Sequence, residues 1–176
     1  MARYAAFLRG MNLGRRRITN PELCAAFEAL GLEEATAHQA SGNVVFDTRM
    51  QKTAALERKI EKGLGTELGY EVATMVRPLE EVAKLAVPPF DDAMLAKAGK
   101  PQIMILQKAP SAATQGEVMA FDAVDDRLCF AHGALYWLPA GKITDSTLDL
   151  RAIQKLVGVN TMRTTGTLAR LTKKFA

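Results

Sequence analysis

The feature that most constrains the fold is an order of apolar segments that occurs twice along the chain. In the first half, a strand pattern is followed by a helix pattern, two short strand patterns, a second helix pattern and one more strand pattern. This order is that of the ferredoxin-like βαββαβ fold. The six segments span residues 4–8, 20–30, 35–40, 44–47, 56–64 and 70–76.

Local patterns in the first half support these assignments. The run from Tyr4 to Leu8 is almost continuously apolar, which is typical of a central strand covered on at least one face. Segment 20–30 places apolar residues at i, i+4 and i+7, the spacing of one helix face. We expect Asn20 to cap this helix, with Pro21 at its first position and Gly31 at its end.

The second half begins the same order again at residue 103. His132-Gly133 predicts a tight turn between its two middle strands, and Asp145 or Ser146 is the expected cap of its second helix. The amino-acid sequence itself does not repeat. The segments are 103–106, 111–119, 124–131, 134–138 and 148–157, followed by a short strand at 160–162 and a last helix containing Leu168, Leu171 and Phe175.

These two halves predict an α+β protein of two ferredoxin-like (βαββαβ-type) lobes. Each lobe is expected to have an antiparallel sheet with helices packed on one face. The predicted lobes are residues 1–78 and 79–176, joined around the proline-containing stretch 78–101. The alternative is one larger mixed sheet.

Composition is that of a globular protein and argues against a disordered, a membrane-spanning or a secreted one. The chain has 176 residues, of which 48% are hydrophobic and 24% charged, so it can form a packed core. Its formal charge of +4 favours anionic partners only weakly. No stretch approaches the roughly 20 apolar residues that cross a bilayer, and the apolar run at the N-terminus is too short for a signal peptide. We therefore predict a cytoplasmic protein without membrane association.

Cysteine and histidine usage predicts neither a disulfide framework nor a metal site. Cys24 and Cys129 lie far apart, each within an apolar segment, and are expected to be buried free thiols. The histidines are His38 and His132, and neither has the spacing of a zinc ligand. No metal and no cofactor is predicted.

Two polar loops are expected to meet at one edge of the first sheet. In a βαββαβ lobe the first two strands run in the same direction, so their C-terminal ends lie at the same edge. The loop 9–17 should therefore lie beside the turn 41–43. Arginine forks and glycine-exposed backbone N–H groups suit a phosphate or carboxylate. The residues predicted to bind such an anion are Arg9, Gly10, Asn12, Gly14, Arg16, Ser41, Gly42 and Asn43.

The alternative for these loops is ordinary turn chemistry, since glycine and asparagine are common in turns and loop arginines are often solvated. A second candidate anion site is Arg163 with the hydroxyl-rich stretch 161–167 before the last helix. There the alternative is capping of that helix by Thr164 or Thr165. Asp125 and Asp126 are expected on alternate faces of a strand, which makes them a poor catalytic pair.

At these positions the chain resembles a bacterial family of unknown function, DUF1697. The resemblance rests on Phe7-Leu8-Arg9-Gly10-Met11-Asn12-Leu13-Gly14 and on Gln39-Ala40-Ser41-Gly42-Asn43-Val44-Val45-Phe46. Tyr136-Trp137-Leu138-Pro139-Ala140-Gly141 with Ser146, and Thr161-Met162-Arg163, are similar to a third and a fourth motif. The resemblance implies a two-lobed α+β fold and no particular activity.

The chain departs from the family pattern in two places. The fourth motif continues as Thr164-Thr165-Gly166, where the family has an aromatic residue between amides. The opening loop carries Arg15-Arg16-Arg17, which makes it more basic. If the fourth motif contributes to a common site, the resemblance implies a different ligand or weaker binding in this member.

Three functions follow from these patterns. The first is binding, with or without catalysis, of a small anionic molecule by the two loops. The second is single-stranded nucleic-acid binding, because βαββαβ is also the order of RNA-recognition modules, although the aromatic signature of those modules is mostly missing. The third is a scaffold or oligomerisation module without a small ligand, which pairs with another copy through sheet edges or an open sheet face. No nucleophile and base stand together, so the sequence leaves open whether the protein is an enzyme, and it does not fix the oligomeric state.

Overall fold

The computed structural model describes residues 1–11, 17–39, 42–121 and 125–175. The chain divides into two compact units, which we describe separately. The first unit comprises residues 1–82 together with Phe175, and the second comprises residues 83–174. Each unit has its own four-stranded antiparallel sheet, so the two-sheet α+β fold is confirmed and the alternative of one larger sheet is excluded.

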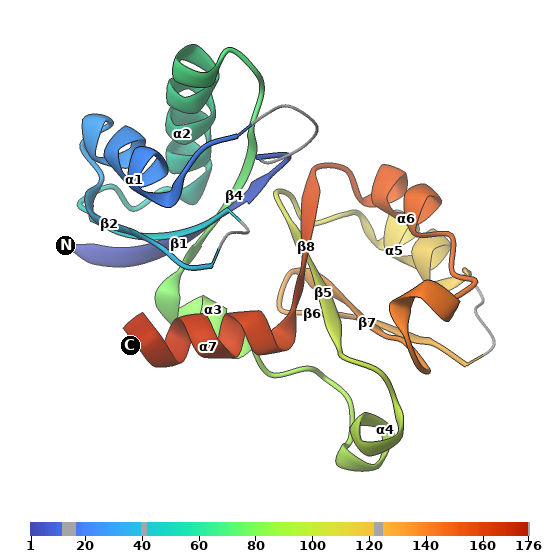
Figure 1. The fold of residues 1–176 in the computed structure, drawn as a ribbon. Coiled ribbons are helices and arrows are strands. Elements are labelled where there is room, and N and C mark those ends of the chain that lie inside the picture. The colour runs from blue at the N-terminus through green and yellow to red at the C-terminus, as the bar shows by residue number, and fades with distance from the viewer. Residues whose placement is uncertain (12–16, 40–41, 122–124, 176) are drawn as a thin grey trace. The chain divides into compact units, whose positions relative to one another are not determined.

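The first unit has the strand order β2-β3-β1-β4, which is that of a ferredoxin-like sheet. Strand β1 lies in the middle and pairs antiparallel with both β3 and β4. Figure 1 shows α1 and α2 together on one face of this sheet. The elements are β1 (Ala2–Arg9), α1 (Asn20–Ala29), β2 (Glu33–Ala37), β3 (Asn43–Thr48), α2 (Thr53–Leu68) and β4 (Ala73–Pro78), followed by α3 (Leu79–Leu85), whose last three residues belong to the second unit.

The second unit repeats this topology, with strand order β6-β7-β5-β8 and all pairs antiparallel. Helices α5 and α6 lie next to each other beside this sheet (Figure 1). The elements are α4 (Asp92–Lys97), β5 (Gln102–Leu106), α5 (Ala112–Met119), β6 (Arg127–Ala131), β7 (Ala134–Leu138), the 3-10 helix η1 (Ile143–Asp145), α6 (Leu150–Val157), β8 (Asn160–Thr164) and α7 (Thr165–Phe175).

The cores follow from alternation along the central strands. In β1, Tyr4, Ala6 and Leu8 pack in the core under α1 and α2. Ala5 and Phe7 point to the other face and are also fully buried, which explains the unbroken apolar run of this strand. In the second unit, Met104 of β5, Val118 of α5, and Ile153 and Val157 of α6 belong to a single cluster.

The helix ends differ from two of our predictions. Thr19, not Asn20, caps α1, because Glu22 completes a reciprocal capping box: Glu22 Oε2 accepts from Thr19 N at 2.7 Å, and Thr19 Oγ1 accepts from Glu22 N at 3.4 Å. Asp149, rather than Asp145 or Ser146, caps α6 by accepting from the backbone N–H of Ala152 at 3.0 Å.

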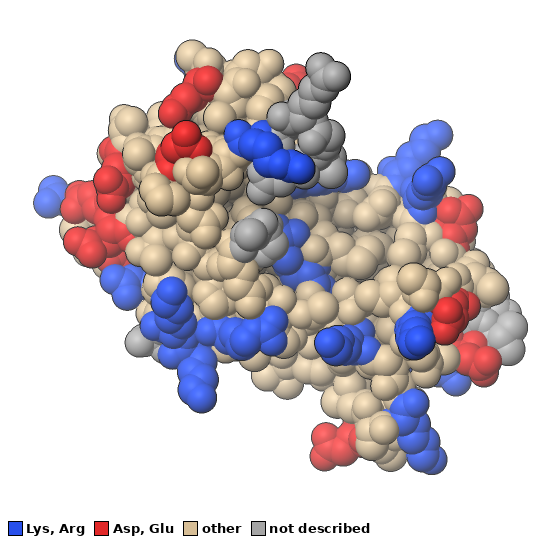
Figure 2. All heavy atoms as spheres, viewed as in Figure 1, with Lys and Arg blue, Asp and Glu red and all other residues tan. Residues whose placement is uncertain are grey.

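Several predictions about shorter segments are corrected, and others are confirmed. Strand β2 begins and ends earlier than residues 35–40, and β4 begins later than residue 70, because Gly69 first ends α2 in a left-handed conformation. Cys24 and Cys129 are free thiols as expected, but both are only half-buried. The turn His132-Gly133 is confirmed, with φ of +52° and +72° at its two residues. In the last turn of α7 lie Lys173 and Lys174, and Figure 2 shows basic side chains over this helix.

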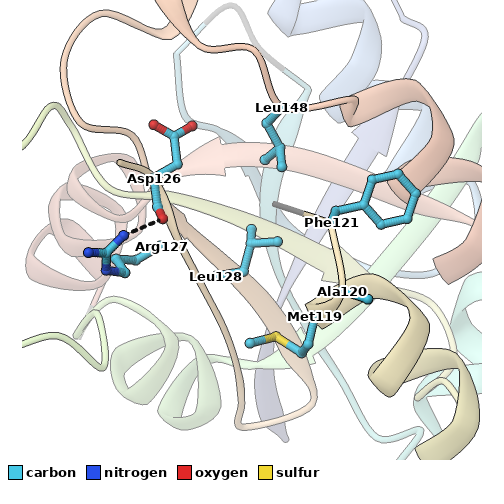
Figure 3. A pocket seen from close by; sticks show the side chains of 7 residues that line it. All are labelled: Met119, Ala120, Phe121, Asp126, Arg127, Leu128 and Leu148. Atoms are coloured by element: carbon cyan, nitrogen blue, oxygen red, sulfur yellow. Dashed lines mark hydrogen bonds between the residues drawn. The ribbon is translucent and has the colours of Figure 1, made fainter. Parts of the chain in front are cut away.

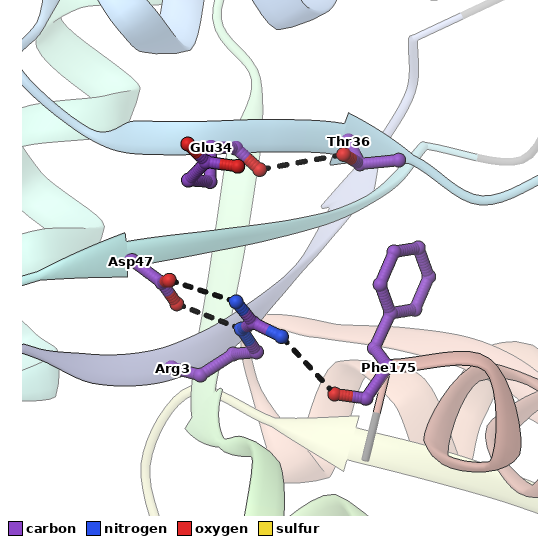
Figure 4. Close-up of polar contacts among 5 residues, drawn as sticks. All are labelled: Arg3, Glu34, Thr36, Asp47 and Phe175. Carbon is purple, nitrogen blue, oxygen red and sulfur yellow. Dashed lines mark hydrogen bonds and ion pairs between the residues drawn. The ribbon is translucent and has the colours of Figure 1, made fainter.

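Strands β1 and β3 are also joined by an ion pair between directly opposed residues. Arg3 donates from Nε and Nη2 to the two carboxylate oxygens of Asp47, at 2.8 and 2.9 Å (Figure 4). These hydrogen bonds hold the pKa of Asp47 below its usual value. Arg3 Nη1 donates to the backbone oxygen of Phe175 at 3.3 Å, also within the first unit.

Both edge strands of the first sheet are protected against pairing with another strand. On β2 the register shifts between Glu33 and Thr36, where Glu34 has a φ of +55°, so the edge is irregular. On β4 the outward backbone N–H groups are occupied by α2. Glu61 Oε1 accepts from Thr74 N, and Glu57 Oε1 accepts from Val76 N, each at 3.0 Å. Burial raises the pKa of Glu57 despite this hydrogen bond.

We expect Glu61→Ala to lower the free energy of unfolding by about 1 kcal/mol, because the partly buried N–H of Thr74 loses its acceptor. Equilibrium denaturation followed by far-UV circular dichroism measures this. The matched control is Glu67→Ala, an exposed acid later in the same helix, which should change stability by less than about 0.5 kcal/mol. Equal effects of the two substitutions would contradict the role of Glu61 as acceptor for the backbone N–H of Thr74.

Candidate functional site

The end of β1 and the turn between β2 and β3 lie against each other, as the topology predicts. Phe7 is opposite Asn43 in the sheet, and the backbone N–H of Leu8 donates to the oxygen of Gly42 at 2.8 Å. A Cβ at Gly42 would lie 3.2 Å from Leu8 Cβ and 3.3 Å from Met11 Cγ. The two loops are therefore in direct contact at this edge.

Backbone conformation explains why glycine occurs on both sides of the contact. Gly10 has a φ of +79° and Gly42 a φ of +69°, a region that side chains with a Cβ rarely adopt. The start of the first loop is held by Tyr70, whose hydroxyl donates to the backbone oxygen of Met11 at 3.2 Å. Met11 itself is buried in the core.

The predicted anion-binding residues of this edge have different environments. Arg9, the last residue of β1, is exposed, and Arg17 is exposed at the far end of the same loop. Asn43 is fully buried, and its Nδ2 donates to the backbone oxygen of His38 at 3.2 Å, which closes the turn. Four of the predicted residues lie outside the described part of the chain: Asn12, Gly14, Arg16 and Ser41.

Arg163 belongs to the second unit and lies in β8. Its Nη1 donates to Thr161 Oγ1 and to the backbone oxygen of Met162, both at 2.8 Å. Burial lowers the pKa of Arg163 to about 10. The fourth motif therefore contains a partly buried arginine held by residues of the motif itself.

Of the two candidate caps for the last helix, the structure selects Thr164. Its Oγ1 accepts from the backbone N–H of Thr167 at 3.1 Å and lies 2.9 Å from Thr167 Oγ1. This hydroxyl pair occupies the first turn of α7, and Arg170 donates to Thr167 Oγ1 at 3.3 Å. The capping interpretation of this stretch is confirmed.

Asp126 of the second unit accepts three hydrogen bonds, and sequence reasoning did not select it. Its Oδ2 accepts from Trp137 Nε1 at 2.8 Å and from Ser146 Oγ at 2.5 Å, and its Oδ1 accepts from Ala140 N at 2.9 Å. The three donors belong to the third family-like motif. Its buried indole and its serine both need an acceptor, which was the signal that could have pointed to Asp126.

The electrostatic state of Asp126 follows from these contacts. Partial burial acts to raise the pKa of its carboxyl group, but hydrogen bonds from Ser146, Ala140 and Trp137 outweigh burial and lower that pKa. Asp126 is therefore ionised at neutral pH. Both aspartates precede β6, which begins at Arg127, so the prediction that they lie on alternate faces of a strand is wrong. Asp125 is exposed whereas Asp126 is half-buried, so the two carboxylates have different surroundings.

Two cavities lie on either side of the start of β6. The larger, of about 410 Å³, lies between the end of α5, the start of β6 and Leu148, which is two residues before α6 (Figure 3). It is lined by Met119, Ala120, Phe121, Asp126, Leu128 and Leu148, together with Arg127. The smaller, of about 300 Å³, is lined by Lys97 and Met94 of α4, by Asp125 and Arg127, and by residues of β7 and its following turn.

The described residues meet the requirements of neither a metal site nor a membrane-spanning helix. Over residues 1–11, 17–39, 42–121 and 125–175, no three His, Cys, Asp or Glu side chains are grouped to hold a metal ion. The helices within those same ranges are too short or too polar to span a bilayer.

Fold and loop geometry together define a class: α+β proteins with two ferredoxin-like sheets and a glycine-lined loop contact at the edge of the first. The chain belongs to the DUF1697 family, described as "Protein of unknown function", whose model matches residues 1–136. The matched residues include the first two motifs. The third motif begins at Tyr136, the last matched residue, and the fourth lies beyond the match.

A solved structure and the curated proteins complete the comparison. The chain is similar to "conserved bacterial protein SP0830 from Streptococcus pneumoniae", with a TM-score of 0.75 and 19% sequence identity. The similarity covers 99% of this chain and 98% of that one, and it shows the fold. No curated protein matches the chain.

Proposed function

We propose that the protein binds a small anionic molecule, carrying a phosphate or a carboxylate, at the edge of the first sheet where the two loops meet. The observation that carries this proposal is the contact between Leu8 and Gly42, which brings two glycine-bearing loops together beside the exposed Arg9. Arginine offers a planar fork of donors to such groups, and Gly42, buried against Leu8 and Met11, lets the two loops approach closely beside it.

Close packing of the described residues of this edge also supports a binding role. Gly42 is packed between Leu8 and Met11, and Tyr70 holds the backbone of Met11. Asn43 contributes by closing its own turn rather than by presenting its amide to solvent. Because these packed residues are held by their neighbours, they lose little conformational entropy on binding, which favours affinity.

Two features weigh against the other functions that the sequence left open. RNA-recognition modules stack bases on exposed aromatic residues of the central strands, whereas Phe7 on β1 is fully buried. Pairing through the edges of the first sheet is hindered, because β2 is irregular and outward N–H groups of β4 are bonded to Glu57 and Glu61. Of the three functions, anion binding therefore agrees best with the described residues.

Arg9→Ala should weaken binding of the anion at least tenfold, because it removes a charged donor from the proposed site. The measurement is isothermal titration with pyrophosphate, nucleoside monophosphates and small carboxylates, at low and high salt. A bound ligand at a hundred times its dissociation constant should also stabilise the protein by about 2.7 kcal/mol.

The matched control is Arg49→Ala, which removes the same charge just after β3, at the opposite end of that strand from Gly42 and Asn43. It should leave the affinity unchanged. If both arginine variants reduce binding equally, the effect is one of general charge. If no anion binds the unaltered protein, the proposed function is wrong.

A further inference from the structure

The larger cavity of the second unit has an apolar wall and one fixed acidic group. Met119 and Phe121, from the end of α5, and Leu128 of β6 supply most of the apolar surface, and Leu148 closes it on the side toward α6. In Figure 3 Leu128 lies between Asp126 and Met119, and the guanidinium of Arg127 points away from the four apolar side chains. Arg127 Nη1 instead donates to the backbone oxygen of Asp126 at 2.9 Å.

Asp126 is the acidic group that lines this cavity, and its position is fixed from three sides. Trp137, Ala140 and Ser146 donate to it, and Ser146 in turn accepts from the backbone N–H of Leu148 at 3.1 Å. All three donors to the carboxylate are neutral groups, and Arg127, whose charge also lowers the pKa of Asp126, donates to its backbone oxygen rather than to the carboxylate. A carboxylate has about four acceptor positions, and the described residues fill three of them.

The combination suits a positively charged ligand with an apolar body. An ammonium or guanidinium group is attracted by an ionised carboxylate, and methionine and phenylalanine side chains also contact cations and apolar groups favourably. The volume of about 410 Å³ lies within the range of small-molecule sites. A plain anion would be repelled by Asp126, and Arg127, the basic residue among the described lining residues, points its guanidinium away from the apolar wall.

We propose that this cavity binds a small organic cation, an amine or guanidinium joined to an apolar or aromatic group. The charged end lies toward Asp126, and the apolar part packs on Phe121, Met119 and Leu128. This proposed site uses other residues than the proposed anion site of the first unit, so a test of one proposal does not test the other.

The first test compares three probes of nearly equal shape: benzylammonium, benzyl alcohol and benzoate. Trp137 is the single tryptophan of the chain and donates to Asp126, so its fluorescence reports on the site; titration calorimetry is the second readout. Benzylammonium should bind saturably with a dissociation constant on the order of 1 mM, as expected for so small a ligand. Equal or tighter binding of benzoate or benzyl alcohol overturns the proposal, and so does the absence of saturable binding by benzylammonium.

The second test changes the charge at Met119, which is 49% exposed and therefore tolerates substitution. Met119→Glu should tighten benzylammonium binding about three- to fivefold, and Met119→Lys should weaken it by a similar factor. The same two changes at Met94, an exposed residue of the smaller cavity, should leave the affinity unchanged. If the Met119 variants fail to act in opposite directions, or if the Met94 variants act equally, the cation site is wrong.

Discussion

Gly99→Ala should lower the free energy of unfolding by about 3 kcal/mol, the upper end of the effects of overpacking. A Cβ at Gly99 would lie only 1.9 Å from the backbone oxygen of Gly141 and 3.2 Å from Pro139 Cγ. The backbone N–H of Gly99 donates to the oxygen of Pro139 at 2.8 Å, so the two segments cannot separate without losing this bond. Because the obstacle is backbone, no side-chain rotation relieves the clash.

Chemical denaturation followed by Trp137 fluorescence measures this effect within the same unit. Gly116→Ala is the control, since nothing lies within 4 Å of a Cβ at this exposed position of α5. It should stabilise the protein by about 0.5–1 kcal/mol, because alanine has the higher helix propensity. Opposite signs for the two glycines are the expected result. A stability loss below about 1 kcal/mol for Gly99→Ala would contradict the close contact.

Asp126→Ala should lower the free energy of unfolding by about 2–3 kcal/mol. The substitution leaves the indole N–H of Trp137, which is almost fully buried, without its acceptor, and it also removes the acceptor of Ala140 and Ser146. The neighbouring Asp125→Ala removes the same charge from an exposed side chain and should change stability by less than about 0.5 kcal/mol. Equal effects would mean that the hydrogen bonds to Asp126 contribute little.

The same carboxyl group predicts a pH dependence with a definite sign. The pKa of Asp126 is lower in the folded protein than its usual value, which is about 3.9 in an unfolded chain. Its stabilising contribution is therefore complete above that value and is lost as the pH falls through the folded-state pKa. The stability difference between the unaltered protein and Asp126→Asn should shrink below about pH 4. A difference that stays constant from pH 6 to pH 3 would contradict this assignment.

The strand order was predictable because it depends on local patterns and on general rules of chain topology. Alternating and continuous apolar runs located β1, β3, β5 and β7, and the rules for connecting strands then placed the loop after β1 beside the turn before β3. The contact of Leu8 with Gly42 confirms that placement. The ends of elements were less predictable, because Asn20 and Thr19 are both good caps and only the reciprocal bonds with Glu22 select Thr19.

The chemistry of the site was only partly predictable. Asn43 appears in the sequence as a polar turn residue and therefore as a candidate ligand contact, whereas in the folded chain it is buried and bonded to His38. Arg163 likewise looked like a donor to an anion, and its Nη1 instead donates to Thr161 and Met162. A sequence gives the type of each side chain, but not whether folding leaves its donors available.

The sequence by itself determined the class of fold, the two sheets with their strand order, the meeting of the first two motifs and the membership of the family. These depend on periodicity and on motifs that are contiguous in the chain. Only the tertiary structure decided that Asp126 joins Trp137, Ala140 and Ser146, residues 11, 14 and 20 positions away. Hydrogen bonds have no period in the sequence, so a carboxylate that organises a loop looks the same as a solvated one until the backbone brings its donors within about 3 Å.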